Sequence, residues 1–345
     1  MTLPAQISRS QSGAVVERIT IEYPARSGAV LACQRAAQDK GIISILYHPS
    51  HERSEILRLE QAMQDRFGVK VLLVPGHPEM LQSTQQDRLK AIGEAVTLTL
   101  AEKAADHVAR VLADAAAGAH AGEEYRIGVA WGRTMHRLAR ALRARPPGVC
   151  PLKLKVYPIV GIVQAAQTLP VQANMIASVT ASGLGAESDQ LPCPAIVTPE
   201  EEAIVNHHQV QAALTALEDL RLVLTGLGPI EDASGADDIM LSPDRVENAR
   251  LYKSACDAGA CGEICCWWFD RDGREVRTKY RSVGLQISGL QRTARDEDRK
   301  GRQVVIVVGG DRRRIVPLKA AILGRFVSVV ITDTVTARAL LGELA

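Results

Sequence analysis

Short apolar runs rich in β-branched residues alternate with helical stretches along most of this chain, and no other feature restricts its fold as strongly. Strands that alternate with helices predict βαβ units, in which a parallel sheet is covered by helices on both faces. We therefore expect a Rossmann-like α/β domain with a mostly parallel sheet. The expected strands are Val69 to Val74, Tyr125 to Ala130, Leu154 to Val160, Leu220 to Leu224, Glu263 to Phe269, Val304 to Val308 and Val327 to Ile331.

The helices expected between these strands are long enough to cover them. Aromatic residues make up only 3% of the chain, so Ala, Val, Leu and Ile must form the core, which suits helices packed on parallel strands. His48-Pro49-Ser50 breaks the pattern and predicts a boundary between a head at 1–48 and the α/β domain at 52–345. The expected helices are Glu52 to Phe67, Arg88 to Ala117, Thr134 to Leu142, residues 172–183 and 200–218, and Thr334 to Leu344.

Composition excludes several classes of protein. No apolar run approaches the roughly 20 residues that span a bilayer, and the segment MTLPAQISRSQSG lacks the apolar core of a signal peptide, so we expect a cytoplasmic protein without a membrane partner. The 7 cysteines are irregularly spaced, which predicts reduced thiols. Cys265 and Cys266, taken as neighbours on a strand, would point to opposite faces, which argues against a shared metal. We expect neither a metal nor a cofactor.

Three expected strands end in glycine-rich or polar turns, and ligands of open α/β sheets bind beyond such strand ends. In Gly128-Val-Ala-Trp-Gly-Arg-Thr134 a strand leads through Gly132 into a helix that begins near Thr134. Free amides at that helix start could hold a phosphate, and a plain turn without a ligand fits the residues equally well. The spacing matches neither a Walker A loop nor GxGxxG.

The other two turns carry weaker signals. Thr225-Gly-Leu-Gly228 could face a sugar or a second side of a phosphate, although a plain loop is the more common meaning of such a spacing. Gly309-Gly-Asp-Arg-Arg-Arg314 places three arginines after a glycine pair. A guanidinium can bind phosphate through two nitrogens, and a solvated helix start is the alternative.

The segment Ile127-Gly-Val-Ala-Trp-Gly-Arg-Thr134 resembles a signature of the effector domain in SorC-type sugar-binding transcriptional regulators. Two more stretches are similar to that family in order and spacing, so the resemblance extends over about residues 40–345. They are Gly259-Ala-Cys-Gly-Glu263 with Phe269-Asp-Arg-Asp-Gly273, and Gly309-Gly310 with Leu318-Lys-Ala-Ala321, Val329-Val-Ile-Thr-Asp333, Thr336-Ala337 and Leu340.

The resemblance implies a fold like that of sugar-phosphate isomerases and glucosamine-phosphate deaminases, used as a sensor of a phosphorylated sugar or polyol and without catalytic residues. It also implies a homodimer or homotetramer. The implied effector contacts are Gly132, Arg133 and Thr134 at the phosphate, Gly226 and Gly228 in the second turn, Glu263 as an acceptor for sugar hydroxyls, Gly309 and Gly310, Arg313 or Arg314 near the phosphate, and Asn174 as a polar group facing the sugar. The family usually has a lysine at the arginine position, and one extra residue after Gly310 leaves open which arginine is equivalent.

The same resemblance implies a helix-turn-helix head that binds operator DNA. Ala32 to Ile43 is similar to a recognition helix that runs into the next strand, whereas the stretch before it, with Pro24, does not predict two helices. We therefore expect a divergent or truncated head, and a protein that senses the effector without binding DNA remains an alternative. The predicted DNA contacts are Arg26, Ser27, Arg35 and Lys40.

An enzyme is the other alternative, because the related isomerase and deaminase folds transfer protons on sugar phosphates. Glu263 or Asp333 could supply a carboxylate, but the sequence offers no clear acid–base pair, and a fold alone does not imply an activity. The additional head favours a regulator.

Overall fold

A computed structural model describes residues 50–118, 120, 122–145, 151–163, 170–230, 245–296 and 301–343. The chain divides into two units, Met1–Leu57 and Arg58–Ala345. The predicted head at 1–48, with Arg26, Ser27, Arg35 and Lys40, lies outside the described residues.

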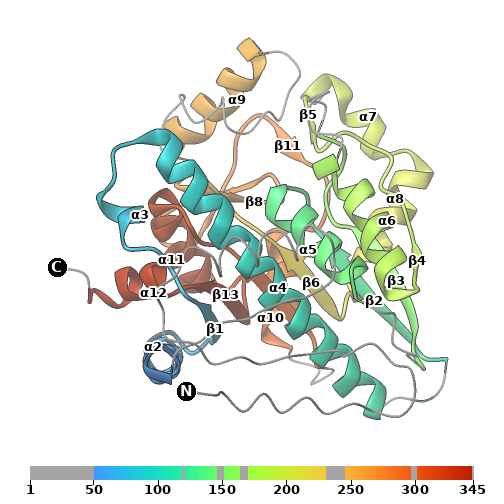
Figure 1. Ribbon diagram of the computed structural model, residues 1–345. Coiled ribbons are helices and arrows are strands. Elements are labelled where there is room, and N and C mark those ends of the chain that lie inside the picture. The colour runs from blue at the N-terminus through green and yellow to red at the C-terminus, as the bar shows by residue number, and fades with distance from the viewer. Residues whose placement is uncertain are drawn as a thin grey trace. The chain divides into compact units, whose positions relative to one another are not determined.

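The second unit is built on a seven-stranded sheet in which every pairing is parallel (Figure 1). The strand order is β1-β13-β12-β6-β2-β3-β4. This confirms the predicted Rossmann-like fold with a mostly parallel sheet. The strands are β1 (Lys70–Val74), β2 (Glu124–Val129), β3 (Lys153–Pro158), β4 (Glu187–Ser188), β6 (Leu222–Thr225), β12 (Gln303–Val307) and β13 (Val329–Asp333).

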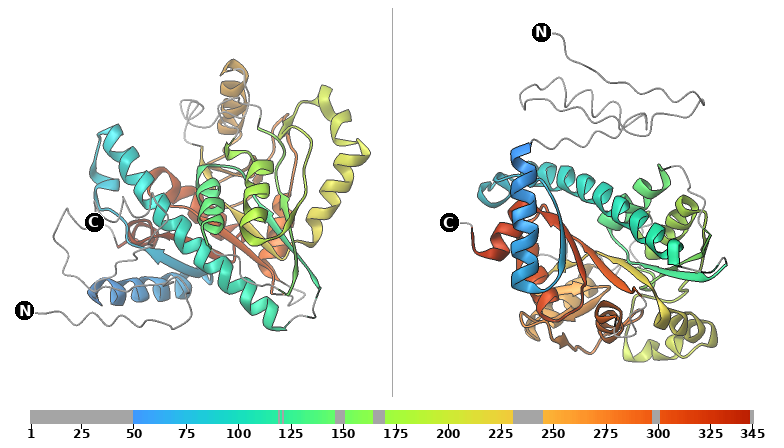
Figure 2. Two further views of the ribbon diagram at one scale, coloured as in Figure 1. Left: turned by 45° about the vertical axis from the view of Figure 1, so that its right-hand side comes forward. Right: turned by 90° about the horizontal axis from the view of Figure 1, so that it is seen from below.

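Helices cover both faces of this sheet, as the apolar character of its central strands requires. Strand β6 and residues 304–307 of β12 are fully buried, and strands buried on both faces are expected to be continuously apolar. Helices α4 (Gln86–Gly118), α5 (Arg133–Arg143) and α6 (Ala173–Leu184) lie on one side, and α10 (Ile287–Arg295) and α11 (Ile315–Leu323) lie on the other (Figure 2).

The direction of the connections reverses between β2 and β6. After β2 the chain crosses through α5 to β3 on one side, and after β6 it returns through α10 to β12 on the other side. Because β2 and β6 are neighbours, their connections diverge to opposite faces at the carboxyl edge between them. Open α/β sheets bind ligands at such a switch point.

Smaller elements complete the described part of the chain. The expected helix at 200–218 is in fact a series of short helices separated by turns, so that prediction is only partly right. None of the described helices is long and apolar enough to cross a membrane. The remaining elements are α2 (Ser50–Phe67), α3 (Glu79–Gln82), η2 (Pro199–Glu201), α7 (Glu202–Val205), α8 (His208–Ala216), η3 (Leu217–Asp219), α9 (Arg245–Asp257), η5 (Arg312–Arg314), α12 (Thr334–Leu341), and the short strands β5 (Ile196–Val197), β7 (Gly228–Pro229), β8 (Gly262–Ile264), β9 (Trp267–Phe269), β10 (Glu275–Val276) and β11 (Arg281–Ser282).

The expected single strand from Glu263 to Phe269 is wrong. Residues 262–269 form a hairpin of β8 and β9, with Cys265 and Cys266 as its two turn residues. Both cysteines have positive φ, 54° and 65°, as a two-residue hairpin turn requires, although glycine and asparagine are the usual residues there. The argument that these cysteines face opposite sides of a strand therefore does not apply.

Candidate functional site

Helix α5 begins at the switch point with its main-chain amides uncovered. Gly132, which precedes the helix, has φ 111° and ψ 163°, a conformation that only glycine adopts without strain. Its own N–H donates to the carbonyl of Val171 at 2.8 Å. No side chain caps the helix, and within the described residues the amides of Arg133 and Thr134 have no hydrogen-bond partner. Free amides at the positive end of a helix dipole suit an anion.

The second glycine turn carries the chain from the main sheet into a small antiparallel sheet of order β10-β9-β8-β7. Gly226 follows β6 directly, and a Cβ there would lie 3.7 Å from the Val307 carbonyl, an ordinary contact. Gly228 lies in β7 opposite Glu263 of β8. The turn therefore places Glu263 beyond the end of β6, and this is the geometric role that the structure shows for these glycines.

Glu263 is a buried carboxyl, with only 4% of its surface exposed. Its Oε2 accepts a hydrogen bond from the Cys266 amide at 2.9 Å. Burial raises the pKa of Glu263 to about 7, although this hydrogen bond and the charge of Arg314 oppose the rise. The carboxyl is thus held by the hairpin turn, and its charge is finely balanced near neutral pH.

The hairpin turn that holds Glu263 is itself fixed on both sides. The Ser282 hydroxyl donates to the Cys266 carbonyl, and the Cys265 sulfur lies 3.5 Å from the Thr225 hydroxyl at the end of β6. These contacts support two residues in a conformation that costs non-glycine residues free energy. The sequence does not indicate this role, because the apolar segment that contains both cysteines predicts a strand.

The three arginines after Gly310 differ in their surroundings. The Arg313 guanidinium pairs with the Asp311 carboxylate, with Nη2 and Oδ2 2.9 Å apart. The Arg314 Nε lies 3.8 Å from Oδ2 of the same carboxylate, but it is buried and makes no hydrogen bond among the described residues. Asp311 thus engages Arg313 and leaves donor capacity on Arg314.

Arg314 connects the separate turns electrostatically. Burial lowers its pKa, the positive charge of Arg133 lowers it further, and the carboxylates of Asp311 and Glu263 raise it. Such mutual effects require Arg133, Glu263 and Arg314 to lie near one another. Helix α5, strand β8 and η5 therefore converge at one rim of the sheet, although these residues are far apart in sequence.

Gly309 and Gly310, which follow β12, lie against the carboxylate of Asp333. The Gly310 N–H donates to the Asp333 carboxylate at 2.9 Å, and Gly310 has a φ of 71°. A Cβ on Gly309 would lie 2.4 Å from the same carboxylate. The structure shows these glycines in contact with Asp333, so the Gly310 amide already has a partner within the protein.

Asn174 also has protein partners for its side chain. Its amide oxygen accepts from the Leu191 N–H at 2.9 Å, and its amide nitrogen donates to the Leu191 carbonyl at 3.3 Å. This pair of bonds fixes the start of α6 to the segment after β4. A contact of Asn174 with a sugar remains a prediction.

Several further polar atoms are buried without a hydrogen bond among the described residues, and two of them belong to elements of the candidate site although they are not among the predicted effector contacts. They are Nδ1 of His136, on α5 one turn after Gly132, and Nε1 of Trp267, on β9. Buried polar atoms without partners are uncommon. The position of His136 four residues after Gly132 is the only signal that the sequence offered for it.

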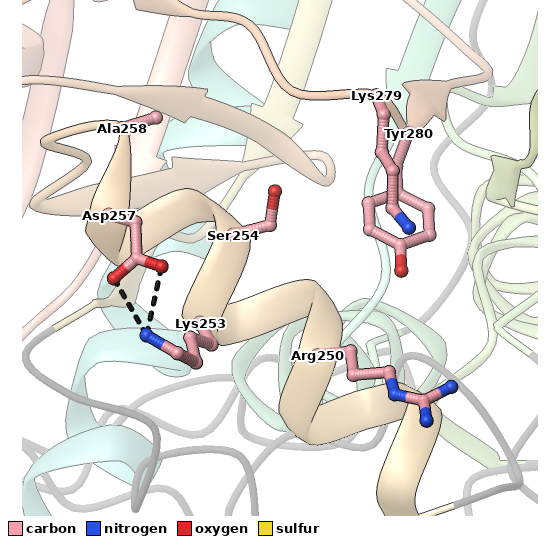
Figure 3. Close-up of a pocket in the computed structure, with 7 residues that line it drawn as sticks. All are labelled: Arg250, Lys253, Ser254, Asp257, Ala258, Lys279 and Tyr280. Atoms are coloured by element: carbon pink, nitrogen blue, oxygen red, sulfur yellow. Dashed lines mark hydrogen bonds and ion pairs between the residues drawn. The ribbon is translucent and has the colours of Figure 1, made fainter.

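Two hollows occur elsewhere on the unit. A groove of about 490 Å³ lies between α9 and residues Lys279 and Tyr280 (Figure 3). Much of its charge is already paired, because Lys253 contacts Asp257 at 2.9 Å and the Tyr280 hydroxyl donates to Glu247 at 2.8 Å. A cavity of about 340 Å³ lies at the amino edge of the sheet, between α4 and the starts of β2, β6 and β12. No predicted effector residue lines either hollow.

Residues 51–342 match the family model Sugar-bind, described as "Putative sugar-binding domain". The chain therefore belongs to this family of sugar-binding domains, and the predicted resemblance is confirmed.

Solved structures of regulators share the fold. The full-length sorbitol operon regulator SorC from Klebsiella pneumoniae has a TM-score of 0.66 at 18% identity, covering 91% of this chain and 89% of that one. A DeoR family transcriptional regulator from Listeria monocytogenes has a TM-score of 0.63 at 18% identity, covering 83% and 99%. The deoxyribonucleoside regulator of Bacillus subtilis (strain 168) is 23% identical over 223 residues, 63% of this chain, and the matched region spans 64% of that regulator's length.

Proposed function

We propose that the protein is a cytoplasmic transcriptional regulator whose DNA binding is controlled by a phosphorylated sugar or polyol. Membership of the sugar-binding family supports a sugar-like effector, and the matched relatives are regulators. The proposed effector domain is residues 52–345, and the proposed DNA-binding head is residues 1–48 with Arg26, Ser27, Arg35 and Lys40.

The phosphate part of the proposal depends on one observation: the uncapped start of α5 and the arginine after β12 share one rim. Gly132, Arg133 and Thr134 present free amides and a cation. Arg314 adds a guanidinium with a free donor, so it is a better candidate than Arg313, which is paired with Asp311. A phosphate oxygen is a strong acceptor for both kinds of donor.

The sugar part of the proposal uses the polar groups beyond β6. Glu263 lies opposite Gly228 and next to Arg314, where a carboxyl can form hydrogen bonds with hydroxyls of the effector. Gly226 and Gly228 shape this side of the site, and Asn174, Gly309 and Gly310 are proposed to support it through Leu191 and Asp333. We further propose that the protein acts as a homodimer or homotetramer, as the resemblance implies.

A thermal-shift screen of sugar phosphates and sugar-alcohol phosphates tests the effector claim. A ligand at about 100 times its Kd stabilises the folded state by about 2.7 kcal/mol, so a cognate effector raises the Tm clearly. Each phosphate is paired with its unphosphorylated parent at the same concentration. Equal stabilisation by both members of every pair, or by neither, would refute the phosphate claim.

A gel-shift assay tests the DNA claim separately. The full chain is titrated against the DNA upstream of its own coding region at a fixed, stated salt concentration, with and without the effector from the screen. We expect specific binding that the effector changes. Effector binding without any specific DNA binding would identify the protein as a sensor that does not bind DNA.

A further inference from the structure

The Glu263 carboxyl has few groups around it that stabilise its charge. Oε2 accepts one hydrogen bond, from the Cys266 amide, and among the described residues Oε1 accepts none. Among the described residues whose pKa is coupled to that of Glu263, Arg314 on η5 is the only charged one. The others are the thiols of Cys265 and Cys266, whose pKa values burial raises, that of Cys265 to about 12, so both stay neutral.

The charge of Arg314 is shared between Glu263 and a second carboxylate. Asp311 lies within 3.8 Å of its Nε, and no ion pair joins Arg314 to Glu263 in the described part of the chain. Arg133 also acts on Arg314 and disfavours its charge. The guanidinium groups of Arg133 and Arg314 and the buried carboxyl of Glu263 therefore lie in one region. An anion that enters this region is attracted by the two guanidinium groups and repelled by the ionised carboxyl.

We propose that effector binding is coupled to proton uptake at Glu263, whose carboxyl becomes protonated as the anion enters and then donates a hydrogen bond to the ligand. The proposal rests on the anion site of the proposed function. It makes Glu263 a specificity-determining residue, because a protonated carboxyl requires an acceptor oxygen on the ligand where a carboxylate requires a hydroxyl donor.

The direction of the pH effect follows from linkage. In the free protein the pKa of Glu263 is about 7, and a nearby negative charge raises the pKa of a carboxyl. The bound state therefore holds more protons than the free state above pH 7, so the affinity for the anion falls as pH rises through this range. Below pH 6 Glu263 is protonated in both states, and the coupling disappears.

Sulfate is the probe of choice because it neither gains nor loses a proton between pH 5 and 9, whereas a phosphate ester would. The full-length protein, without added buffer, is held in a pH-stat and titrated with sodium sulfate adjusted to the same pH. Sodium chloride of equal ionic strength is the matched control, since salt alone shifts pKa values. Sulfate affinity is measured in parallel by thermal shift from pH 5.5 to 8.5.

At pH 7.5 we expect the wild type to take up between about half and three quarters of a proton per bound sulfate, because about a quarter of Glu263 is already protonated in the free protein, and at pH 5.5 almost none. The dissociation constant should rise by up to about tenfold between pH 6 and 8.5 for each unit by which sulfate raises the pKa of Glu263. Glu263→Gln, which is neutral at every pH, should bind sulfate without proton uptake and with a flat pH profile.

His136 lies on α5 one turn after Gly132 with its Nδ1 buried and without a hydrogen bond in the described residues, so His136→Gln is the matched variant. Proton uptake that persists in Glu263→Gln and is lost in His136→Gln would overturn the assignment to Glu263. Sulfate binding without proton uptake in the wild type at pH 7.5 would overturn the coupling while leaving the anion site intact. Absence of saturable sulfate binding at every pH would overturn both. The wild-type comparison between pH 5.5 and 7.5 does not depend on the folding of any variant.

Discussion

Helices α5 and α12 begin at the same edge of the sheet, but only α12 has a side-chain cap at its amino end. Helix α12 is capped by Asp333, whose carboxylate accepts from the Thr336 N–H and hydroxyl, each at 2.8 Å, and from the Gly310 N–H. Helix α5 follows Gly132 and has no side-chain cap and no acidic residue in its first turn. One helix start is thus neutralised within the protein, and the other keeps its donors free.

The difference separates groups that stabilise the rim from groups that can bind a ligand. An internal carboxylate occupies the donors of α12 permanently, and it would repel an anion. Asp311 likewise caps η5, where its carboxylate accepts a hydrogen bond from the Arg313 N–H at 3.0 Å. The amides of α5 have no such competitor, so an external anion can complete that helix at little cost.

The largest expected effect comes from removing the carboxylate of Asp333, which caps helix α12. Asp333→Ala removes three hydrogen bonds and leaves buried donors of Gly310 and Thr336 without partners, so we expect the free energy of unfolding to fall by about 3 kcal/mol or more. Urea denaturation measures it. Asp272→Ala, at an exposed carboxylate paired with Arg274, is the control and should change stability by less than about 0.5 kcal/mol. A loss below about 1 kcal/mol for Asp333→Ala would show that Asp333 is not needed to close the rim.

The two arginines of η5 offer the next test. Arg314 is buried near the charge of Arg133 and has a donor without a partner in the described residues, so Arg314→Ala should weaken sulfate binding by about 30-fold, which is about 2 kcal/mol. Arg313→Ala should change the affinity by less than about threefold, because Asp311 already engages that side chain. Sulfate titration followed by thermal shift measures both. Equal losses in the two variants would contradict the distinction between them.

The conformation of Gly132 can be tested against a second glycine with positive φ. Gly132→Ala forces a side chain into a strained region and should cost about 1–3 kcal/mol of stability together with a clear loss of sulfate affinity. Gly185→Ala, at the C-terminal end of α6 with φ 64°, should cost about 1 kcal/mol through strain alone. A Cβ meets nothing within 4 Å at either position, so contacts do not confuse the comparison. Unchanged sulfate binding in Gly132→Ala would remove this turn from the site.

The smallest effects come from one threonine substitution in the first turn of α5 and one in the first turn of α12. Thr134→Val should weaken sulfate binding by about three- to tenfold, the value of one lost hydrogen bond, with little change in stability. Thr336→Val should lower stability by about 1 kcal/mol, because its hydroxyl donates to Asp333, and should leave sulfate binding unchanged. The reverse assignment of the two effects would overturn the comparison between the helices.

Much of the fold was predictable because the central strands are continuous β-branched runs that can only be buried between helices. Val304 to Val308 and Val327 to Ile331 could be identified in this way, and their parallel pairing followed from the helices between them. The prediction failed at Glu263 to Phe269, where Cys265 and Cys266 take a left-handed turn that local sequence does not favour. Tertiary contacts from Thr225 and Ser282 support that turn, and they are not visible in a local pattern.

The candidate site was predictable only as a set of turns. That Gly132 precedes an uncapped helix could be inferred from its position between a strand and a helix. The sequence could not show that Asp333 occupies the Gly310 amide or that Asp311 engages Arg313, because each depends on how a carboxylate is placed in three dimensions. The choice between Arg313 and Arg314 likewise follows from geometry.

The strand order has a consequence for how the protein is made. β12 and β13 fill the space between β1 and β6, yet they follow β1, β2, β3, β4 and β6 in the sequence and are therefore synthesised after them. Until they arrive, β1 has no neighbour in the sheet, and the rim lacks both Arg314 and Asp333. A nascent chain that has already released Gly132 and Glu263 therefore lacks part of the proposed anion site, which is complete only after β13 has been synthesised.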